Sequence, residues 1–344
     1  MRALPQASDP LLRRMTLDEL REYVARPRSP AGPESACFVP VEVRDILETK
    51  RLLDIPRDRV ARLGREAVEV NRRGEYTSPS GRTVSIAKEV ENSRTSTVEY
   101  APNHPWPPPP PNSGRAPTIE VSNETSLSAA YRLREDGLAP TVLNFASATT
   151  PGGGFLSGAR AQEEYLARSS GLHACLEGRA MYAACRARLD PFYDDWVIHS
   201  PAVPIFRDDT GAFLEKPWNC DILTSPAVQA NGVRRYRPER EGEIEAVMRR
   251  RIRCVLAAAA EHRCRAVVLG AWGCGAFGND TPTIARLFRE ELDAWSAAFD
   301  RVIFAVTDWS PERRFIGPFE REFGPRGCVP ASLAIAKTAA RRVS

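Results

Sequence analysis

With 344 residues, 42% of them hydrophobic and 27% charged, the chain can bury a substantial core as one large domain or two medium ones. A net charge of +4 permits an acidic ligand but does not by itself indicate nucleic-acid binding, and no specific nucleic-acid partner is expected. No run of 18 apolar residues is present and the N-terminus lacks the apolar core of a signal peptide, so we expect a cytoplasmic monomer without a membrane partner.

The N-terminal arm, residues 1–58, carries two short helical candidates, Leu17–Ala25 after the possible cap Thr16 and Val43–Leu53. Its mainly helical character predicts an extension to the main domain, and no function can be assigned to it.

Residues 59–115 are predicted to form a helical accessory region that ends in a linker. Helix Arg59–Gly74 ends at a glycine, as a helix with a glycine C-cap does, and a short strand is expected over Thr83–Ala87. The run Pro107–Pro111 favours a stiff surface spacer, while docking into an aromatic groove is the alternative.

Strands and helices alternate over residues 116–325, which predicts one α/β domain followed by a basic tail, residues 326–344. The predicted strands are Thr118–Val121, Thr141–Ala146, Val197–Phe206, Cys220–Thr224, Ala266–Gly270 and Arg301–Val306. The predicted helices are Ser126–Glu135, segments within Gln162–Leu189, Glu243–Glu261 and Pro282–Phe299.

A glycine-rich turn follows the apolar strand Thr141–Ala146. Gly152, Gly153 and Gly154 strip the loop of side chains, so its backbone N–H groups can approach a ligand such as phosphate. Gln162, Glu163 and Glu164 come directly behind this loop. Alone, the glycines indicate no more than a flexible connection and the glutamates no more than a solvated face. Together, after a buried strand, they favour a site.

A second glycine loop, Gly273-Cys-Gly-Ala-Phe-Gly278, lies between a predicted strand and a helix that begins near Asp280 or Thr281 with Pro282 in its first turn. The pattern G-x-G-x-x-G is also the dinucleotide fingerprint of oxidoreductases. Against that hypothesis, the loop comes in the last quarter of the chain, and the nearest acidic residue after the next strand, Asp308, comes too late to bind a ribose.

The eight cysteines are scattered without a C-x-x-C pair, which predicts reduced thiols rather than disulfides. Only His262 and Cys264 are close enough in sequence to suggest shared ligation, so there is no zinc pattern. We therefore expect no metal and no cofactor.

The order GGG, seven residues, QEE resembles the signature of the bacterial-type poly(ADP-ribose) glycohydrolases, enzymes with a macrodomain fold. The resemblance runs from about Val60 to Phe323 and includes Asn144-Phe-Ala-Ser-Ala148 and the second glycine loop. It implies a three-layer α/β/α sandwich with a mixed central sheet. It also implies hydrolysis of ribose–ribose bonds in poly(ADP-ribose), or on ADP-ribosylated proteins, with ADP-ribose as product and a place in ADP-ribosylation reversal and the DNA damage response.

The same resemblance assigns roles to individual residues. By match to QEE, Glu164 is the general acid and later base, Glu163 orients the ribose hydroxyls, and Gln162 supports the loop. The remaining substrate-binding positions that it implies are Asn144 at the distal ribose, the two glycine loops around the diphosphate (Gly152, Gly153, Gly154; Gly273, Cys274, Gly275, Ala276, Gly278) and Phe277 against the sugar. The adenine contacts stay open, with Phe206 and Phe304 as candidates only.

Cleavage of such a bond needs a proton for the leaving oxygen, and a carboxylic acid that is protonated near neutral pH needs a raised pKa. A desolvated pocket and a like-charged neighbour both act in that direction. Two other functions are weighed beside the glycohydrolase: a non-catalytic ADP-ribose-binding macrodomain, which would not need the QEE acid, and an NAD-dependent oxidoreductase.

Overall fold

The computed structural model describes residues 53–111 and 116–324. The helix predicted over Leu17–Ala25, nearly all of that over Val43–Leu53, and the tail 326–344 lie outside these residues. No helix in the described ranges is both long and apolar enough to cross a bilayer.

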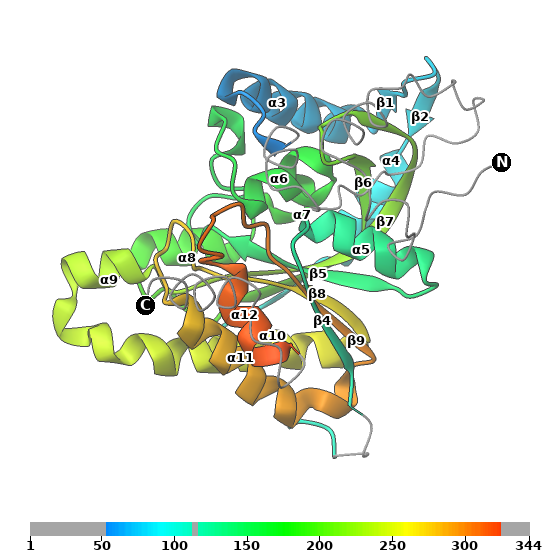
Figure 1. Cartoon of the computed structure of the whole chain (residues 1–344). Helices are drawn as coiled ribbons and strands as arrows, with labels where there is room; N and C mark the ends of the chain where they lie inside the picture. The colour runs from blue at the N-terminus through cyan, green and yellow to red at the C-terminus, as the bar shows by residue number, and fades with distance from the viewer. Residues whose placement is uncertain (1–52, 112–115, 325–344) are drawn as a thin grey trace, which may run out of the picture. The chain divides into compact units, whose positions relative to one another are not determined.

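A seven-stranded mixed sheet forms the centre of the fold, in the order β3-β6-β7-β5-β8-β9-β4 (Figure 1). The five strands from β7 to β4 are parallel to one another, whereas β6 is antiparallel to β7 and to the edge strand β3. The strands are β3 (Val98–Tyr100), β4 (Thr118–Ser122), β5 (Pro140–Ala146), β6 (Val197–Arg207), β7 (Phe213–Pro226), β8 (Ala266–Leu269) and β9 (Arg301–Ala305). A separate hairpin pairs β1 (Glu75–Thr77) with β2 (Thr83–Ser85).

Helices cover both faces of the sheet, which confirms the predicted three-layer sandwich (Figure 1). The helices are α3 (Arg57–Arg73), α4 (Ala87–Ser96), α5 (Ser126–Glu135), α6 (Gln162–Ser169), α7 (Leu172–Leu176), α8 (Ala180–Arg188), α9 (Ala230–Tyr236), α10 (Ile244–Glu261), α11 (Thr281–Trp295) and α12 (Ile316–Phe323), with 3-10 turns η1 (Phe155–Ser157), η2 (Pro238–Glu243) and η3 (Ser296–Ala298).

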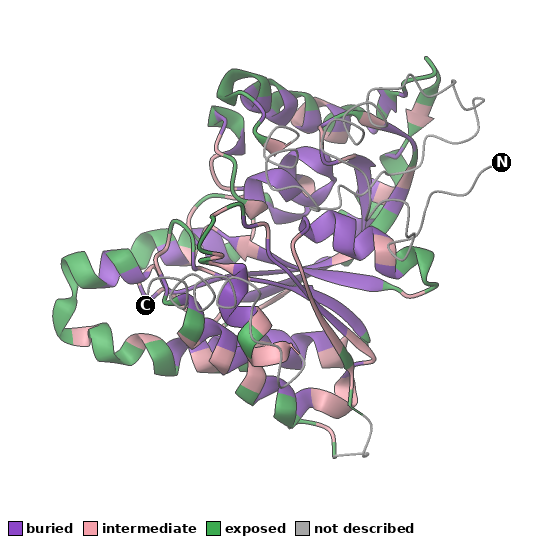
Figure 2. Cartoon of the chain, in the orientation of Figure 1, coloured by how far each residue is buried: buried purple, intermediate pink, exposed green. Residues whose placement is uncertain are grey.

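The central strands of the sheet are mostly buried in Figure 2, whereas the edge strands β3 and β4 are partly exposed. Side chains of the central strands alternate between two hydrophobic cores. In β8, Val267 and Leu269 face the core under α10 and α11, whereas Ala266 and Val268 face the core under α5, α7 and α8. A strand buried on both faces is continuously apolar, which is why β5 and β8 were predictable from sequence.

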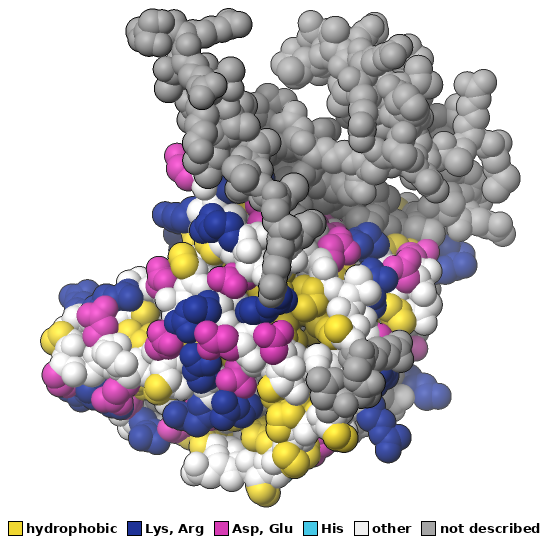
Figure 3. All heavy atoms as spheres, turned by 60° about the horizontal axis from the view of Figure 1, so that its bottom comes forward, with side chains coloured by type: hydrophobic (Ala, Val, Ile, Leu, Met, Phe, Trp, Pro, Cys, Tyr) yellow, Lys and Arg dark blue, Asp and Glu magenta, His cyan; other side chains and the backbone are white. Residues whose placement is uncertain are grey.

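Charged side chains of both signs lie side by side over much of the face that is turned forward in Figure 3. Ion pairs link helices α10 and α11, for example Arg253 with Glu291 at 2.9 Å and Arg286 with Glu245 at 2.9 Å. This face therefore presents no extended area of a single charge.

Several elements differ from the prediction. Strand β7 runs over Phe213–Pro226 rather than Cys220–Thr224, because its first half pairs with β6 in an antiparallel hairpin and carries polar residues such as Glu215 and Lys216. The predicted strand Thr83–Ala87 ends at Ser85, and α4 begins at Ala87. Five further elements were not predicted because they are short or weakly periodic in sequence: α4, β1, β3, α9 and α12.

Helix α3 packs against the 3-10 turn η1, which directly follows the three glycines. Its buried residues recur at helical spacing, among them Val60, Leu63, Ala67 and Val70. Gly64 allows close contact with η1, because a Cβ at this position would lie 2.6 Å from the carbonyl oxygen of Phe155. The accessory region thus supplies the support on which the glycine-rich turn rests.

The predicted C-cap Gly74 has φ +70° and lies against the start of α4, where an added Cβ would meet the Cβ of Ala87 at 2.4 Å. Gly81 also has a left-handed φ of +83°, but it has open space around it.

We expect Gly81→Ala to lower the free energy of unfolding by about 1 kcal/mol, the cost of the backbone conformation alone. Gly74→Ala should lower it by roughly 3 kcal/mol or more, because the clash is added. Urea denaturation of the two variants measures the difference, and equal losses would contradict the contact between α3 and α4.

Candidate active site

The first residue of α6, Gln162, ties this helix to the end of β5. Its side-chain oxygen accepts the N–H of Phe145 at 2.9 Å, and its nitrogen donates to the carbonyl of Leu143 at 2.8 Å and to Ser126 Oγ at 3.1 Å. An amide that donates and accepts in this way acts like a further stretch of backbone beside the strand. The two glutamates that follow are therefore held at the carboxyl end of β5.

Both glutamates are buried, Glu163 at 3% and Glu164 at 8% exposure. Each has one oxygen held by a backbone N–H. Glu163 Oε2 accepts from Ser147 at 2.6 Å, and Glu164 Oε1 accepts from Gly154 at 2.9 Å. The second oxygen of each, Glu163 Oε1 and Glu164 Oε2, has no partner among the described residues. The pair thus keeps two acceptor positions unused.

Backbone conformation and the lack of side chains in the glycine-rich turn allow the two carboxyl groups to approach it. Gly152 and Gly153 have φ of +70° and +58°, values that other residues rarely adopt. At Gly153, a Cβ would lie 2.3 Å from Glu164 Oε1 and 2.9 Å from Glu163 Oε2. The absence of a side chain therefore lets two carboxyl groups approach the backbone.

Burial raises the pKa of Glu163 well above its ordinary value of 4.5. The N–H of Ser147 opposes this shift, whereas the negative charge of Glu164 adds to it. Position at the start of a helix, where the dipole favours carboxylates, offsets part of the cost of burying the pair.

A cavity of about 380 Å³ opens beside the pair, at the carboxyl ends of the parallel strands. This is where open α/β sheets bind ligands, and the volume is that of a small-molecule site. Its lining includes Gln162, Glu163, Glu164, Gly273, Gly275, Ala276, Phe277, Trp309 and Phe315. The structure thus brings the QEE segment and much of the second glycine loop together.

The second glycine loop precedes α11, which is capped by Asp280 through the N–H of Thr283 at 3.0 Å. The sequence left Asp280 and Thr281 as alternative caps, and Asp280 holds the position. The consecutive N–H groups of Gly275, Ala276 and Phe277 find no acceptor among the described residues. Such a run of unpaired N–H groups is suited to an anion.

Some predicted residues lie apart from the cavity. Asn144 is fully buried on β5 and donates to Thr224 Oγ1 at 3.2 Å, so its contact with a ribose stays a prediction. Cys274 and Gly278 border a second cavity of about 580 Å³, together with four arginines, Arg234, Arg313, Arg314 and Arg321.

Phe206 and Phe304 are core residues, fully buried away from the cavity, and the suggestion that they contact adenine is wrong.

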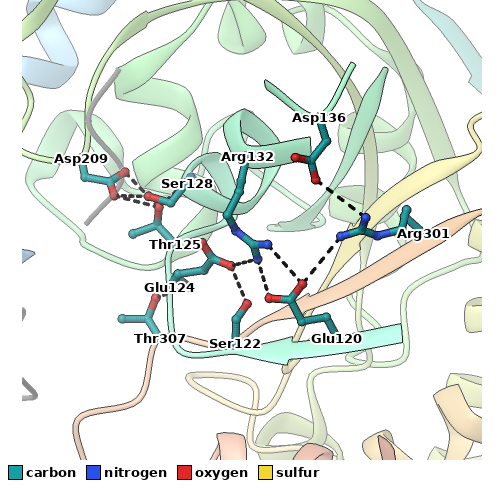
Figure 4. A network of polar contacts seen from close by, with 10 residues as sticks. All are labelled: Glu120, Ser122, Glu124, Thr125, Ser128, Arg132, Asp136, Asp209, Arg301 and Thr307. Carbon is teal, nitrogen blue, oxygen red and sulfur yellow. Dashed lines mark hydrogen bonds and ion pairs between the residues drawn. The ribbon is translucent and has the colours of Figure 1, made fainter. Parts of the chain in front are cut away.

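A buried polar network that the sequence did not reveal forms part of the cavity wall. Asp209 accepts from Ser128 Oγ at 2.6 Å and from Thr125 Oγ1 at 2.9 Å (Figure 4). It also accepts from the hydroxyl of Tyr165. Burial raises the pKa of Asp209, and these hydrogen bonds act against the rise. The network joins the starts of α5 and α6 to the loop after β6. In the sequence, Asp208-Asp209-Thr-Gly has only the composition of a turn.

The loop after β4 is fixed by charges next to this network. Figure 4 shows Arg132 of α5 between Glu120 and Glu124, and its Nη2 lies 2.7 Å from a carboxylate oxygen of each. Ser122 Oγ also donates to Glu124 at 2.5 Å. These contacts hold the segment before Thr125, which lines the cavity.

Comparisons with known proteins bear directly on this site. A family model described as the catalytic domain of microbial-type poly(ADP-ribose) glycohydrolase matches residues 64–208. The chain is similar to the crystal structure of poly(ADP-ribose) glycohydrolase from Thermomonospora curvata, with 43% identity and a TM-score of 0.73 over 77% of this chain and 100% of that one.

The chain belongs to the bacterial-type poly(ADP-ribose) glycohydrolases.

Two further structures of this family match. The T. curvata enzyme bound to the inhibitor ADP-HPD is 42% identical, with a TM-score of 0.70 over 77% of this chain and 100% of that one. The Deinococcus radiodurans enzyme in complex with ADP-ribose is 40% identical, with a TM-score of 0.64 over 70% and 98%. A search of the curated proteins found no match. The resemblance drawn from the two loop motifs is thus confirmed at the level of family and fold.

The raised pKa of Glu163 predicts a pH-dependent stability. The folded protein binds a proton on this group more tightly than the unfolded chain does, so stability from this source is present at low pH and is lost as pH rises above the ordinary pKa of 4.5. Glu163→Gln removes the charge and keeps an oxygen for Ser147. We expect the melting temperature of this variant, relative to the unsubstituted protein, to increase between about pH 5 and pH 8.

Glu239→Gln, at an exposed position in η2, provides the control and should show a difference that does not change with pH. A difference that is also flat for Glu163→Gln would show that this carboxyl ionises without penalty.

Proposed function

We propose that this protein hydrolyses ribose–ribose O-glycosidic bonds of poly(ADP-ribose) and releases ADP-ribose, with Glu164 as general acid and base. The observation that carries the proposal is the pair of buried carboxyl groups on a cavity wall, each held at one oxygen and unpartnered at the other. Membership of the glycohydrolase family and the ADP-ribose and ADP-HPD complexes of its relatives support the substrate class.

In the proposed reaction, Glu164 gives its proton to the glycosidic oxygen that leaves, and the bond from that oxygen to the ribose carbon breaks. A water molecule then attacks the oxocarbenium-like carbon and gives its proton to the Glu164 carboxylate, which restores the acid. The N–H of Gly154 holds Oε1 throughout, so Oε2 is the oxygen that exchanges the proton. Because the second carboxyl is adjacent in sequence, the two cannot face each other across the bond as in most glycosidases.

Glu163 is proposed to orient the ribose hydroxyls. Its burial favours the neutral form, which can donate a hydrogen bond to one hydroxyl as well as accept one from another. The N–H of Ser147 fixes Oε2, which leaves Oε1 for the sugar.

The diphosphate is proposed to lie on the second glycine loop. The unpaired N–H groups of Gly275, Ala276 and Phe277 supply three donors at the cavity wall, and an anion can bind them without a Lys or Arg side chain. Phe277 lines the cavity within this loop and is proposed to pack against the sugar. Removal of ADP-ribose polymers in the cytoplasm, as part of a DNA damage response, is the proposed setting for a monomeric enzyme of this kind.

The central test is Glu164→Ala. We expect this variant to bind ADP-ribose within about threefold of the unsubstituted protein, because the loops that hold the diphosphate are intact. We expect release of ADP-ribose from automodified polymer to fall on the order of 10³-fold, because the proton donor is gone. Calorimetry and chromatography of the products measure the two quantities.

Glu177→Ala is the matched control and should retain full activity. Full hydrolysis by the Glu164→Ala protein would remove Glu164 from the mechanism. Failure of the unsubstituted protein to cleave polymer, with ADP-ribose still bound, would instead indicate a reader.

Gly153→Ala tests the contact between the turn and the carboxyl pair. The new methyl group would displace Glu164 Oε1 and Glu163 Oε2, and we expect kcat to fall at least about 100-fold. Gly81→Ala has a similar backbone conformation with no such neighbours, and its kcat should be unchanged. Unchanged turnover in Gly153→Ala would mean that the carboxyl groups reach their working positions without this turn.

A further inference from the structure

A second cluster of ionisable side chains lies at the opposite end of the strands from the cavity. His199 is on β6, Asp221 is on β7, and Cys264 follows α10. Asp221 pairs in register with Thr141, at the start of β5, whereas the carboxyl pair lies beyond the end of β5. The cluster is therefore separate from the proposed substrate site.

One ligand atom from each of these three residues lies within 4.8 Å of the other two. His199 Nε2 and Asp221 Oδ2 are 3.2 Å apart. Around a tetrahedral zinc ion with bonds of about 2.0–2.3 Å, ligand atoms are separated by roughly 3.2–3.8 Å. The three side chains thus need to close by only about 1 Å to share an ion.

The chemistry of the three donors selects for the ion. An imidazole nitrogen, a thiolate sulfur and a carboxylate oxygen form a mixed set that fits Zn²⁺, whereas Mg²⁺ and Ca²⁺ prefer oxygen ligands alone. A thiolate and a carboxylate together balance the charge of a divalent ion, which matters because His199 and Cys264 are 4% and 5% exposed.

Neighbouring groups hold the donors in place. The N–H of Ala202 donates to Asp221 Oδ1 at 2.8 Å, which leaves Oδ2 directed at His199. Ala202 itself has a φ of +49°, a conformation unusual for alanine, at a register shift in β6. The ring of His262 stacks on that of His199 with centroids 3.7 Å apart, and its Nε2 shares a hydrogen bond of 2.8 Å with the Tyr100 hydroxyl.

We propose that His199, Asp221 and Cys264 form a zinc site with one water molecule as the fourth ligand. Asp221 is one-third exposed and gives the ion and the water a path from solvent. Binding breaks the S–H bond of Cys264, forms a Zn–S bond and releases one proton to the buffer. The ion would connect β6, β7 and the segment after α10, so its role is to stabilise this end of the sheet.

The test uses the full chain, stripped of metal with a chelator and titrated with Zn²⁺ and with Co²⁺. We expect one equivalent of metal per chain, proton release in calorimetry, and a thiolate-to-cobalt charge-transfer band. At free zinc near 100 times the Kd, the melting temperature should rise by roughly 5 °C or more.

Cys264→Ser should remove the charge-transfer band and weaken zinc binding at least about 100-fold. Asp221→Asn should also weaken zinc binding, and because Asp221 is partly exposed this variant should still fold. Cys254→Ser changes a thiol within α10 that is not part of the cluster, and this variant should bind zinc as the unsubstituted protein does. Absence of stoichiometric binding would overturn the proposal, and so would a band that survives in Cys264→Ser, since the metal would then lie on other thiols.

Discussion

The structure depends on the attachment of the first turn of α6 to the end of β5. The Gln162 side chain bonds to the N–H of Phe145 and to the carbonyl of Leu143, and this fixes both the position and the direction of the helix. This junction sets the position of the two buried carboxyl groups, because Glu163 and Glu164 are the next two residues of the chain. A helix that began one residue later would rotate both carboxyl groups away from the cavity.

Burial of two adjacent carboxyl groups is costly, and the turn before α6 shows how the cost is offset. Two backbone N–H groups, from Ser147 and Gly154, each bind one oxygen, and the helix N-terminus adds a favourable field. The donors can approach only because Gly153 has no side chain. The glycine-rich turn therefore positions the buried carboxyl pair, in addition to any contact that its backbone makes with phosphate.

Much of the fold and the centre of the site could be predicted from sequence, because they depend on local patterns. Continuous apolar runs predicted β5 and β8, and apolar residues at helical spacing followed by a glycine predicted α3 and its C-cap. The glycines and QEE marked the carboxyl pair. What was missed depends on contacts between distant segments: the first half of β7 is polar and exists through pairing with β6, and Asp209 gains its role only where α5 and α6 converge. Phe206 and Phe304 stand near strand ends in sequence but point into cores. The histidine, aspartate and cysteine cluster comes from three segments, so no spacing motif could reveal it.

The close contact of Gly64 with Phe155 also bears on how the molecule assembles. A stretch near residue 60 supports a turn near residue 155, so the geometry of the carboxyl pair is a non-local feature that depends on the docking of α3. A fragment that starts after α3 would retain the β5 strand and both carboxyl groups and yet have an unsupported turn. Alignment of the two carboxyl groups thus depends on a helix that lies far from the turn in sequence.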